Sequence, residues 1–176
     1  THIYFAFQEI VSREVSALDS AVVTIGKFEG GKTHNAIPSQ VIMEGTIRFH
    51  KKEIGDFIYK RMEEITTNTA ELFRGSATIE EIASVPPLVN DETLANEVGG
   101  YIKDIVGENS VKVYKGQGMG SEDFASYSYE VPSMYLMLGA GSKDENPQYG
   151  LPMHHPSVVF NEEILSTGAA IHAYSS

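Results

Sequence analysis

Two adjacent prolines, Pro86 and Pro87 in the segment VPPLVND, separate two stretches of this sequence that have different patterns. Proline has no backbone N–H, and it restricts the preceding residue to extended conformations. The segment therefore fits neither a helix nor the middle of a sheet. We predict a connection between two domains there, with one domain at residues 1–86 and the other at residues 87–176.

The first half has the pattern of a small α+β layer. Apolar residues recur at helical spacing in two segments and alternate in three others. Helices are predicted at residues 3–15 and 53–73, and strands at 21–31, 41–49 and 76–84. The segment GGKTHNAIPS, rich in turn-forming residues, joins the first two strands. We expect helices on one face of an antiparallel sheet.

The second half alternates helices and strands in the manner of an α/β domain. Helices are predicted at residues 91–107, 121–129 and 161–176, and strands at 111–114 and 132–141. Asp91 and Ser121 are placed to cap the first two helices. The run PSMYLMLGAG is nearly continuously apolar, as in strands buried on both faces. Because the strands are too few for a complete sheet, we interpret this half as part of a larger domain.

Charge and composition exclude several classes of function. The formal charge is -11 and the basic residues are scattered, so we expect no nucleic-acid partner, which would require a basic stripe. No apolar run approaches the roughly 20 residues that span a bilayer, so we expect no membrane partner. The absence of cysteine fits a cytoplasmic location. Because the chain opens at Thr1 directly in a helical pattern, we expect a piece of a longer polypeptide.

Two adjacent histidines, His154 and His155, follow the last predicted strand in GLPMHHPSVVFNEE. Ligands gather at the carboxyl ends of strands in open α/β sheets. Adjacent side chains on extended backbone diverge, so both rings can hardly bind one ion. A zinc site needs three or four ligands, and no HxxxH, HxH or HxxE pair occurs here. Spacing alone leaves open a surface histidine or a metal ligand whose partners come from elsewhere.

Two other segments carry candidate binding groups. In GQGMGSEDF, a glycine-rich loop precedes a helix, but Glu122 and Asp123 in its first turn would repel a phosphate, so at most a neutral substrate backbone could touch the loop. In THNAIPSQVIMEGTIR, Asn35 lies near a hairpin tip and Arg48 near the end of the returning strand. Arginine offers a planar fork for a carboxylate, and asparagine offers a donor and an acceptor. Taken alone, the two also fit a turn residue and a solvated strand charge.

Three parts of the sequence resemble, in the same order, three regions of the aminoacylase, carboxypeptidase G and hippurate hydrolase metallopeptidase family. They are GGKTHNAIPSQVIMEGTIR, then GMGSEDFA with VPSMYLMLGAG, and finally MHHPSVVFNEEILSTGAAIHA. The similarity is closest to its amidohydrolase branch, which includes hydrolases of N-acyl and indoleacetyl amino acids. The resemblance implies an α/β fold with an α+β insert. A ferredoxin-like two-layer lid, through which subunits form a homodimer, would be followed here by the C-terminal portion of a mixed-sheet zinc-peptidase catalytic domain.

The resemblance also implies a function and its residues. Family members hydrolyse N-acyl amino acids or small peptides with two divalent metal ions, zinc or manganese. His154 matches the last metal ligand, whereas His155 falls where many relatives have a small residue. Asn35 and Arg48 match substrate-binding lid positions, and in several relatives the residue matching Asn35 reaches into the partner subunit's site. Gly120 matches a loop lining the cleft.

The general base and most metal ligands of the family have no counterpart in this sequence. We therefore expect the isolated chain to be inactive, although the complete protein would be an enzyme. Two readings from other classes remain open. The chain could be a noncatalytic dimerisation and lid module, or a small-ligand-binding α+β domain, which only the lid-like half suggests.

Overall fold

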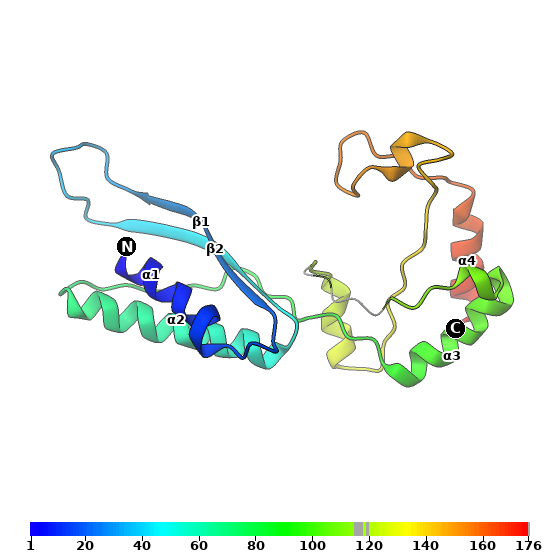
Figure 1. The fold of residues 1–176 in the computed structure, drawn as a ribbon, viewed down its shortest axis with the longest axis horizontal. Coiled ribbons are helices and arrows are strands. Elements are labelled where there is room, and N and C mark those ends of the chain that lie inside the picture. Colours follow the sequence, from blue (N-terminus) through cyan, green and yellow to red (C-terminus); the bar gives the residue numbers. More distant parts are fainter. Residues whose placement is uncertain (115–117, 119, 176) are drawn as a thin grey trace. The chain divides into compact units, whose positions relative to one another are not determined.

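The computed structural model describes residues 1–114, 118 and 120–175 (Figure 1). The chain forms two compact units, which are described separately. The first contains Thr1–Leu88 and the described residues of Gln117–Ala125, and the second contains the described residues of Val89–Gly116 and Ser126–Ser176. Among the described residues, no helix combines the length and the apolar character needed to cross a membrane.

An antiparallel hairpin forms the sheet of the first unit, where strand β1 (Ala21–Gly30) pairs with strand β2 (Val41–Phe49). The register shifts between Ile25 and Lys27, which leaves Gly26 unpaired as a bulge. Before the shift Val23 lies opposite Ile47, and after it Phe28 lies opposite Met43. Val23 and Phe28 are an odd number of residues apart, so a regular strand would place them on opposite faces. The bulge brings both onto the same face.

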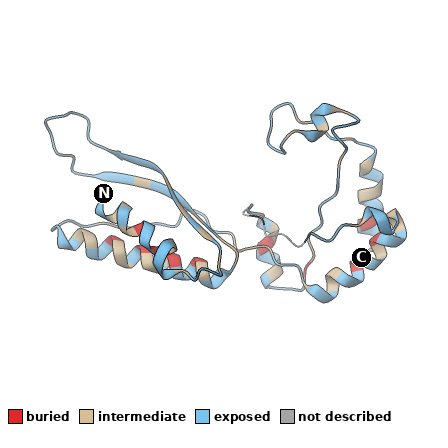
Figure 2. Ribbon diagram, in the orientation of Figure 1, coloured by how far each residue is buried: buried red, intermediate tan, exposed pale blue. Residues whose placement is uncertain are grey.

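Two helices cover that apolar face, as the periodicity predicted. Helix α1 (His2–Glu9) continues into a short π-helical segment at Ile10–Glu14, and helix α2 spans Lys52–Leu72. The buried core of this unit consists of Phe7, Ile10, Ile58 and Met62 (Figure 2). Partly buried strand residues pack against it, namely Ala21, Val23, Ile25 and Ile47. Each fully buried side chain of this size contributes roughly 1.5–3 kcal/mol, so this layer holds the unit together.

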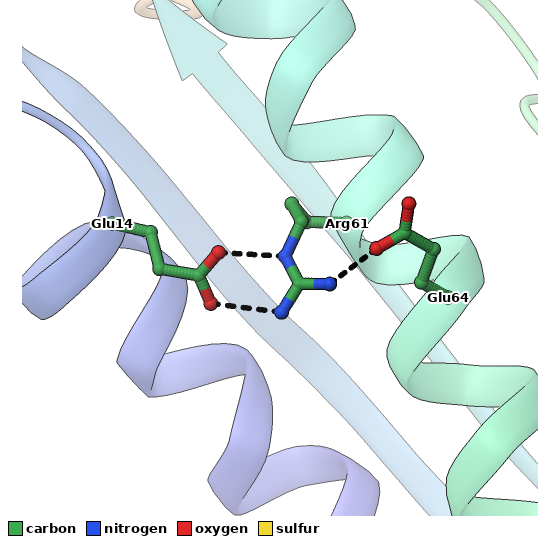
Figure 3. Close-up of polar contacts among 3 residues, drawn as sticks. All are labelled: Glu14, Arg61 and Glu64. Atoms are coloured by element: carbon green, nitrogen blue, oxygen red, sulfur yellow. Dashed lines mark hydrogen bonds and ion pairs between the residues drawn. The ribbon is translucent and has the colours of Figure 1, made fainter.

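An ion-pair network joins the end of the first helical segment to α2 (Figure 3). Arg61 Nε and Nη2 donate to the two carboxylate oxygens of Glu14 at 2.6 and 3.1 Å, and Nη1 donates to Glu64. The hydrogen bond from Arg61 holds the pKa of Glu14 below its usual value, although partial burial opposes this effect. The same bonds raise the pKa of Arg61. The pair therefore favours the ionised form of both groups in the folded state.

The segment at residues 76–84, predicted as a strand, joins no sheet in the described structure. Burial alternates only over residues 77–80, where Ala77 and Ile79 are less exposed than Thr78 and Glu80, whereas Ile82 is 88% exposed. Ile79 also packs against the core of the first unit. A strand requires a neighbour with unpaired backbone groups beside it, and the sheet consists of β1 and β2 alone. The predicted strand at residues 76–84 is therefore wrong, and alternating burial is present only over residues 77–80.

Helices α3 (Glu92–Val106) and α4 (Ile164–Tyr174) form the framework of the second unit. Asp91 Oδ1 accepts a hydrogen bond from the Leu94 N–H at 2.8 Å, so the predicted cap is confirmed. Gly107 ends α3 with a φ of 82°, a conformation that favours glycine. The two helices share a small buried cluster of Val98, Ile102 and Ile171. Helix α4 begins three residues later than predicted, because the Asn161 side chain caps a turn before it.

Residues 111–114 and 132–141 form no strand in the described part of the second unit. Asn90 instead supplies a substitute partner for the longer segment. The Tyr135 N–H donates to Asn90 Oδ1 at 2.8 Å, and Asn90 Nδ2 donates to the Tyr135 carbonyl at 3.1 Å. Leu136, Met137 and Leu138 remain 38%, 75% and 44% exposed. This apolar run therefore lacks the neighbouring strands that would bury it.

The predicted helix at residues 121–129 is a shorter 3₁₀ helix at Asp123–Tyr129. Glu122, rather than the predicted cap Ser121, accepts a hydrogen bond from the Phe124 N–H at 3.4 Å. A carboxylate beside the first N–H groups of a helix satisfies donors that have no partner within the helix. Glu122 therefore has a structural contact at the start of this helix.

The Glu14–Arg61 pair predicts a pH-dependent stability. The folded pKa of Glu14 lies below the ordinary value of 4.5, so the pair stabilises the fold above that pH and loses its effect as the pH falls through the lowered value. We expect Glu14→Gln to lower the free energy of unfolding near neutral pH, with the difference from wild type vanishing in acid. Urea denaturation of the purified wild-type and Glu14→Gln chains, from neutral pH down to below the lowered pKa of Glu14, measures this difference in the free energy of unfolding.

Glu9→Gln is the matched control, because Glu9 is exposed on the same helical segment and its carboxylate has no partner among the described residues. Its substitution should change stability little at any of these pH values. A Glu14→Gln deficit that persists unchanged in acid would contradict the ion-pair account.

Candidate functional site

The two histidines lie in a loop at residues 141–160, which ends shortly before α4. At its base, the Asn161 N–H donates to the Ala140 carbonyl at 2.9 Å. Around the histidines, the His155 N–H donates to the Pro152 carbonyl at 2.8 Å, and the Val158 N–H donates to the His155 carbonyl at 3.1 Å. The loop is thus closed at its base, and two successive turns shape the part that carries the histidines.

The environments of the two imidazole rings differ. His155 Nδ1 accepts a hydrogen bond from the Ser157 N–H at 3.1 Å. The ring of His154 is exposed and makes no hydrogen bond or ion pair with any residue that the structure describes. His154 can therefore offer a ring nitrogen to an external ligand, whereas the loop itself uses the ring of His155.

The described residues do not hold a complete metal site. Among them, no three side chains of the types His, Asp and Glu lie close enough together to bind an ion. A zinc site takes three or four protein ligands. His154 fits one coordination position, and the other positions would need ligands from outside this set.

An open hollow of about 440 Å³ adjoins the base of the loop. It is lined by Gly139, Gly141, Ser142, Glu145, Asn161, Glu163 and Ile164. Gly141 has a φ of 121°, and a Cβ there would lie 2.4 Å from the ring of Tyr149, so this position requires glycine. The hollow also includes Gly139, so it adjoins the apolar run at residues 132–141 as well as the loop that carries the histidines.

The two predicted substrate-binding side chains lie at opposite ends of the hairpin. Asn35 is exposed in the loop after β1, at the end where Gly30 pairs with Val41, whereas Arg48 pairs with Val22 at the other end. The seven residue steps from Val41 to Arg48 correspond to about 23 Å at roughly 3.3 Å per residue. One hairpin therefore does not bring these two side chains together.

Arg48 projects from the face of the sheet that the helices leave open. Its neighbour Ile47 packs against the core, and successive side chains of a strand point to opposite faces. Arg48 is exposed on that open face. A guanidinium in this position is accessible to a carboxylate from another molecule.

Gly120 is described and exposed, and a Cβ there would meet no atom within 4 Å. Three other residues of the predicted glycine-rich loop, 116, 117 and 119, lie outside the described residues. The role of Gly120 in lining a cleft stays a prediction.

Gln148 makes two contacts in this loop that were not predicted from the sequence. Its Nε2 donates to the Ser157 carbonyl at 3.1 Å, and its N–H donates to Asn146 Oδ1 at 3.0 Å. The Asn146–Pro147 dipeptide signals a turn, which could have indicated the second contact. An exposed glutamine in a loop carries no periodicity, so no pattern indicated the first.

The profile of peptidase family M20/M25/M40 matches residues 6–175. The chain is 36% identical to the IAA-amino acid hydrolase ILR1-like 4 of Arabidopsis thaliana, over 98% of this chain and 40% of that protein. It is 31% identical to the N-acetyl-L-cysteine deacetylase of Bacillus subtilis, over 89% of this chain and 35% of that protein. These alignments show that the chain spans well under half the length of the curated relatives it matches.

Solved structures give the same assignment. The YxeP protein of Bacillus subtilis, described as a dinuclear metal-binding peptidase of the M20 family, superposes with a TM-score of 0.71 and 25% identity. The superposition covers 99% of this chain and 43% of that protein. The observed arrangement of helices and hairpin is therefore that of part of an M20-type peptidase fold.

Proposed function

The chain belongs to peptidase family M20/M25/M40, and on this basis we propose that the complete protein is a metal-dependent amide hydrolase of N-acyl amino acids or small peptides. The observation that carries the proposal is the similarity, over 98% of the chain, to a hydrolase of amino acid conjugates. A second relative is named for removing an acetyl group from cysteine. Both names describe hydrolysis of an acylated amino acid.

His154 supplies one ligand of the metal site in this proposal. Its ring is exposed and bonded to no described residue, and the similar Bacillus subtilis YxeP protein binds two metals. The remaining ligands and a general-base carboxylate come from a part of the protein outside residues 1–176, because the relatives are more than twice as long as the matched region. Divalent ions such as zinc or manganese, when bound, activate water and polarise an amide carbonyl.

Arg48 binds the carboxylate of the substrate. Its guanidinium is exposed on the open face of the hairpin, and a planar fork matches a carboxylate with two parallel hydrogen bonds. Asn35 lies in the loop before β2, whose first residue, Val41, is about 23 Å from Arg48 by strand length, so the two side chains serve different active sites. In a homodimer, the exposed loop that carries Asn35 reaches the partner subunit's site.

The first unit is the lid and dimerisation domain, and it is ferredoxin-like when complete. In that topology, a strand preceding the first helix lies between the third and fourth strands of the sheet. Such a strand would pair with the free edge of β2 and with residues 76–84, which have no strand partner in the described structure and whose burial alternates over residues 77–80. The exposed edge of β1 then serves the homodimer. Residues 87–176 are the C-terminal part of a cytoplasmic enzyme's catalytic domain.

We expect the complete protein to release free amino acids from N-acetyl amino acids, to lose this activity with a chelator, and to regain it with zinc or manganese. Residues 1–176 alone should release none, because most ligands lie elsewhere. Amino acid release from a panel of acyl donors measures both. Hydrolysis that resists chelation, or turnover by the isolated chain, would contradict the proposal.

We expect Arg48→Ala in the complete protein to raise KM for N-acetyl amino acids about tenfold or more, because a hydrogen bond to a charged group contributes about 1.5–3 kcal/mol. Arg48→Lys should not restore KM, since an ammonium lacks the planar fork. Steady-state kinetics on folded, purified variants measures these effects.

Lys27→Ala is the matched control, because Lys27 is a cation of the same hairpin whose partners are the exposed Glu44 and Glu29. Its KM should stay at the wild-type value. A second control is the N-acetyl amino acid amide, which lacks the carboxylate. If Arg48→Ala weakened binding of the amide and the acid equally, Arg48 would not be the carboxylate ligand.

A further inference from the structure

The ring of His155 closes the turn that follows it. Its Nδ1 accepts a hydrogen bond from the Ser157 N–H at 3.1 Å. The backbone of the same residue makes two more bonds, to the Pro152 carbonyl at 2.8 Å and from the Val158 N–H at 3.1 Å. Three contacts of one residue thus define the backbone directly after His154.

Gln148 holds the same segment from the other side. Its Nε2 donates to the Ser157 carbonyl at 3.1 Å, while the Asn146 side chain caps the turn in which Gln148 lies. Ser157 is therefore bound through its N–H by His155 and through its carbonyl by Gln148. The stretch from Gln148 to Ser157, which contains His154, is closed into a ring by side chains of the loop itself.

The contact of His155 decides which of the two rings is available to a metal. In a neutral imidazole one nitrogen is an acceptor and the other carries the proton. Because Nδ1 of His155 already accepts from Ser157, the proton lies on Nε2, and neither nitrogen has a lone pair left for an ion. His154 has no such contact within the described residues.

We propose that His155 is a positioning residue, whose bond to Ser157 fixes the turn that presents the His154 ring to a metal ion. The inference rests on the proposed function, because it requires His154 to be a ligand. A loop fixed before the ion arrives loses less conformational freedom on binding, which raises affinity. Residues that orient a metal ligand without touching the ion commonly change metal affinity 10–100-fold when replaced, by order of magnitude.

Asparagine can test this role specifically. The bond runs from a side-chain acceptor to the N–H two residues later, which is the geometry of an Asx turn. In His155→Asn, the Oδ1 atom can accept the same hydrogen bond, whereas the imidazole is gone. In His155→Ala, both are lost. If His155 is a positioning residue, His155→Asn should therefore retain zinc affinity. If His155 is a ligand, His155→Asn should lose zinc affinity, because zinc sites are built from Cys, His, Asp and Glu.

The experiment measures zinc affinity and stoichiometry of the complete protein by competition with a chromophoric chelator. Thermal unfolding of the metal-free variants establishes that each is folded. We expect His155→Ala to weaken zinc binding about 10–100-fold, as replacement of an orienting group does, and His155→Asn to bind within about threefold of wild type. His154→Ala should lose at least one ion.

Each possible result distinguishes a positioning role of His155 from a ligand role, or tests the assignment of His154. If His155→Asn loses zinc as severely as His155→Ala, His155 is itself a ligand and the positioning role is wrong. If both bind like wild type while His154→Ala loses zinc, the positioning role alone is wrong and the proposed function stands. If His154→Ala keeps both ions at wild-type affinity, the assignment of His154 in the proposed function fails, and the positioning role fails with it.

Discussion

Backbone pairing between β1 and β2 is the interaction on which the order of the first unit depends. It creates the apolar face on which α1 and α2 pack, and the bulge at Gly26 keeps Val23 and Phe28 on that same face. A strand forms only where a neighbouring strand can pair with its backbone, and this requirement explains why two predicted strands are absent from the described structure. Residues 76–84 and 132–141 have strand-like patterns, yet they pair with no strand in the described structure.

The structural features that were predicted correctly from the sequence are those that depend on residues close together in the chain. The α2 helix, the hairpin strands and the Asp91 cap depend on periodicity and on neighbours a few residues away, and all three were predicted. The pairing of residues 132–141 depends on distant segments, so alternation and apolar character alone did not determine it. The contact between Gln148 and Ser157 involves exposed polar groups in a loop, where no periodic pattern exists.

The candidate site also combines a local part, which nearby residues form, with a part that requires distant segments. The loop that carries His154 is shaped by its own side chains and backbone, so the presentation of this ring is encoded within a few residues. A metal site, by contrast, needs several ligands from separate segments. Asn35 and Arg48 similarly lie toward opposite ends of β2, so one hairpin does not bring the two proposed substrate-binding side chains together. In the proposed function, the chain therefore provides parts of a site that other segments and a second subunit complete.

Anomalous diffraction at the zinc edge, from crystals of the complete protein, can distinguish whether His154 or His155 binds the metal ion. We expect an anomalous peak about 2.1 Å from a ring nitrogen of His154, with His155 Nδ1 still accepting from the Ser157 N–H. A peak bonded to His155 instead, or a zinc site that includes neither histidine, would show that the proposed assignment of His154 is wrong.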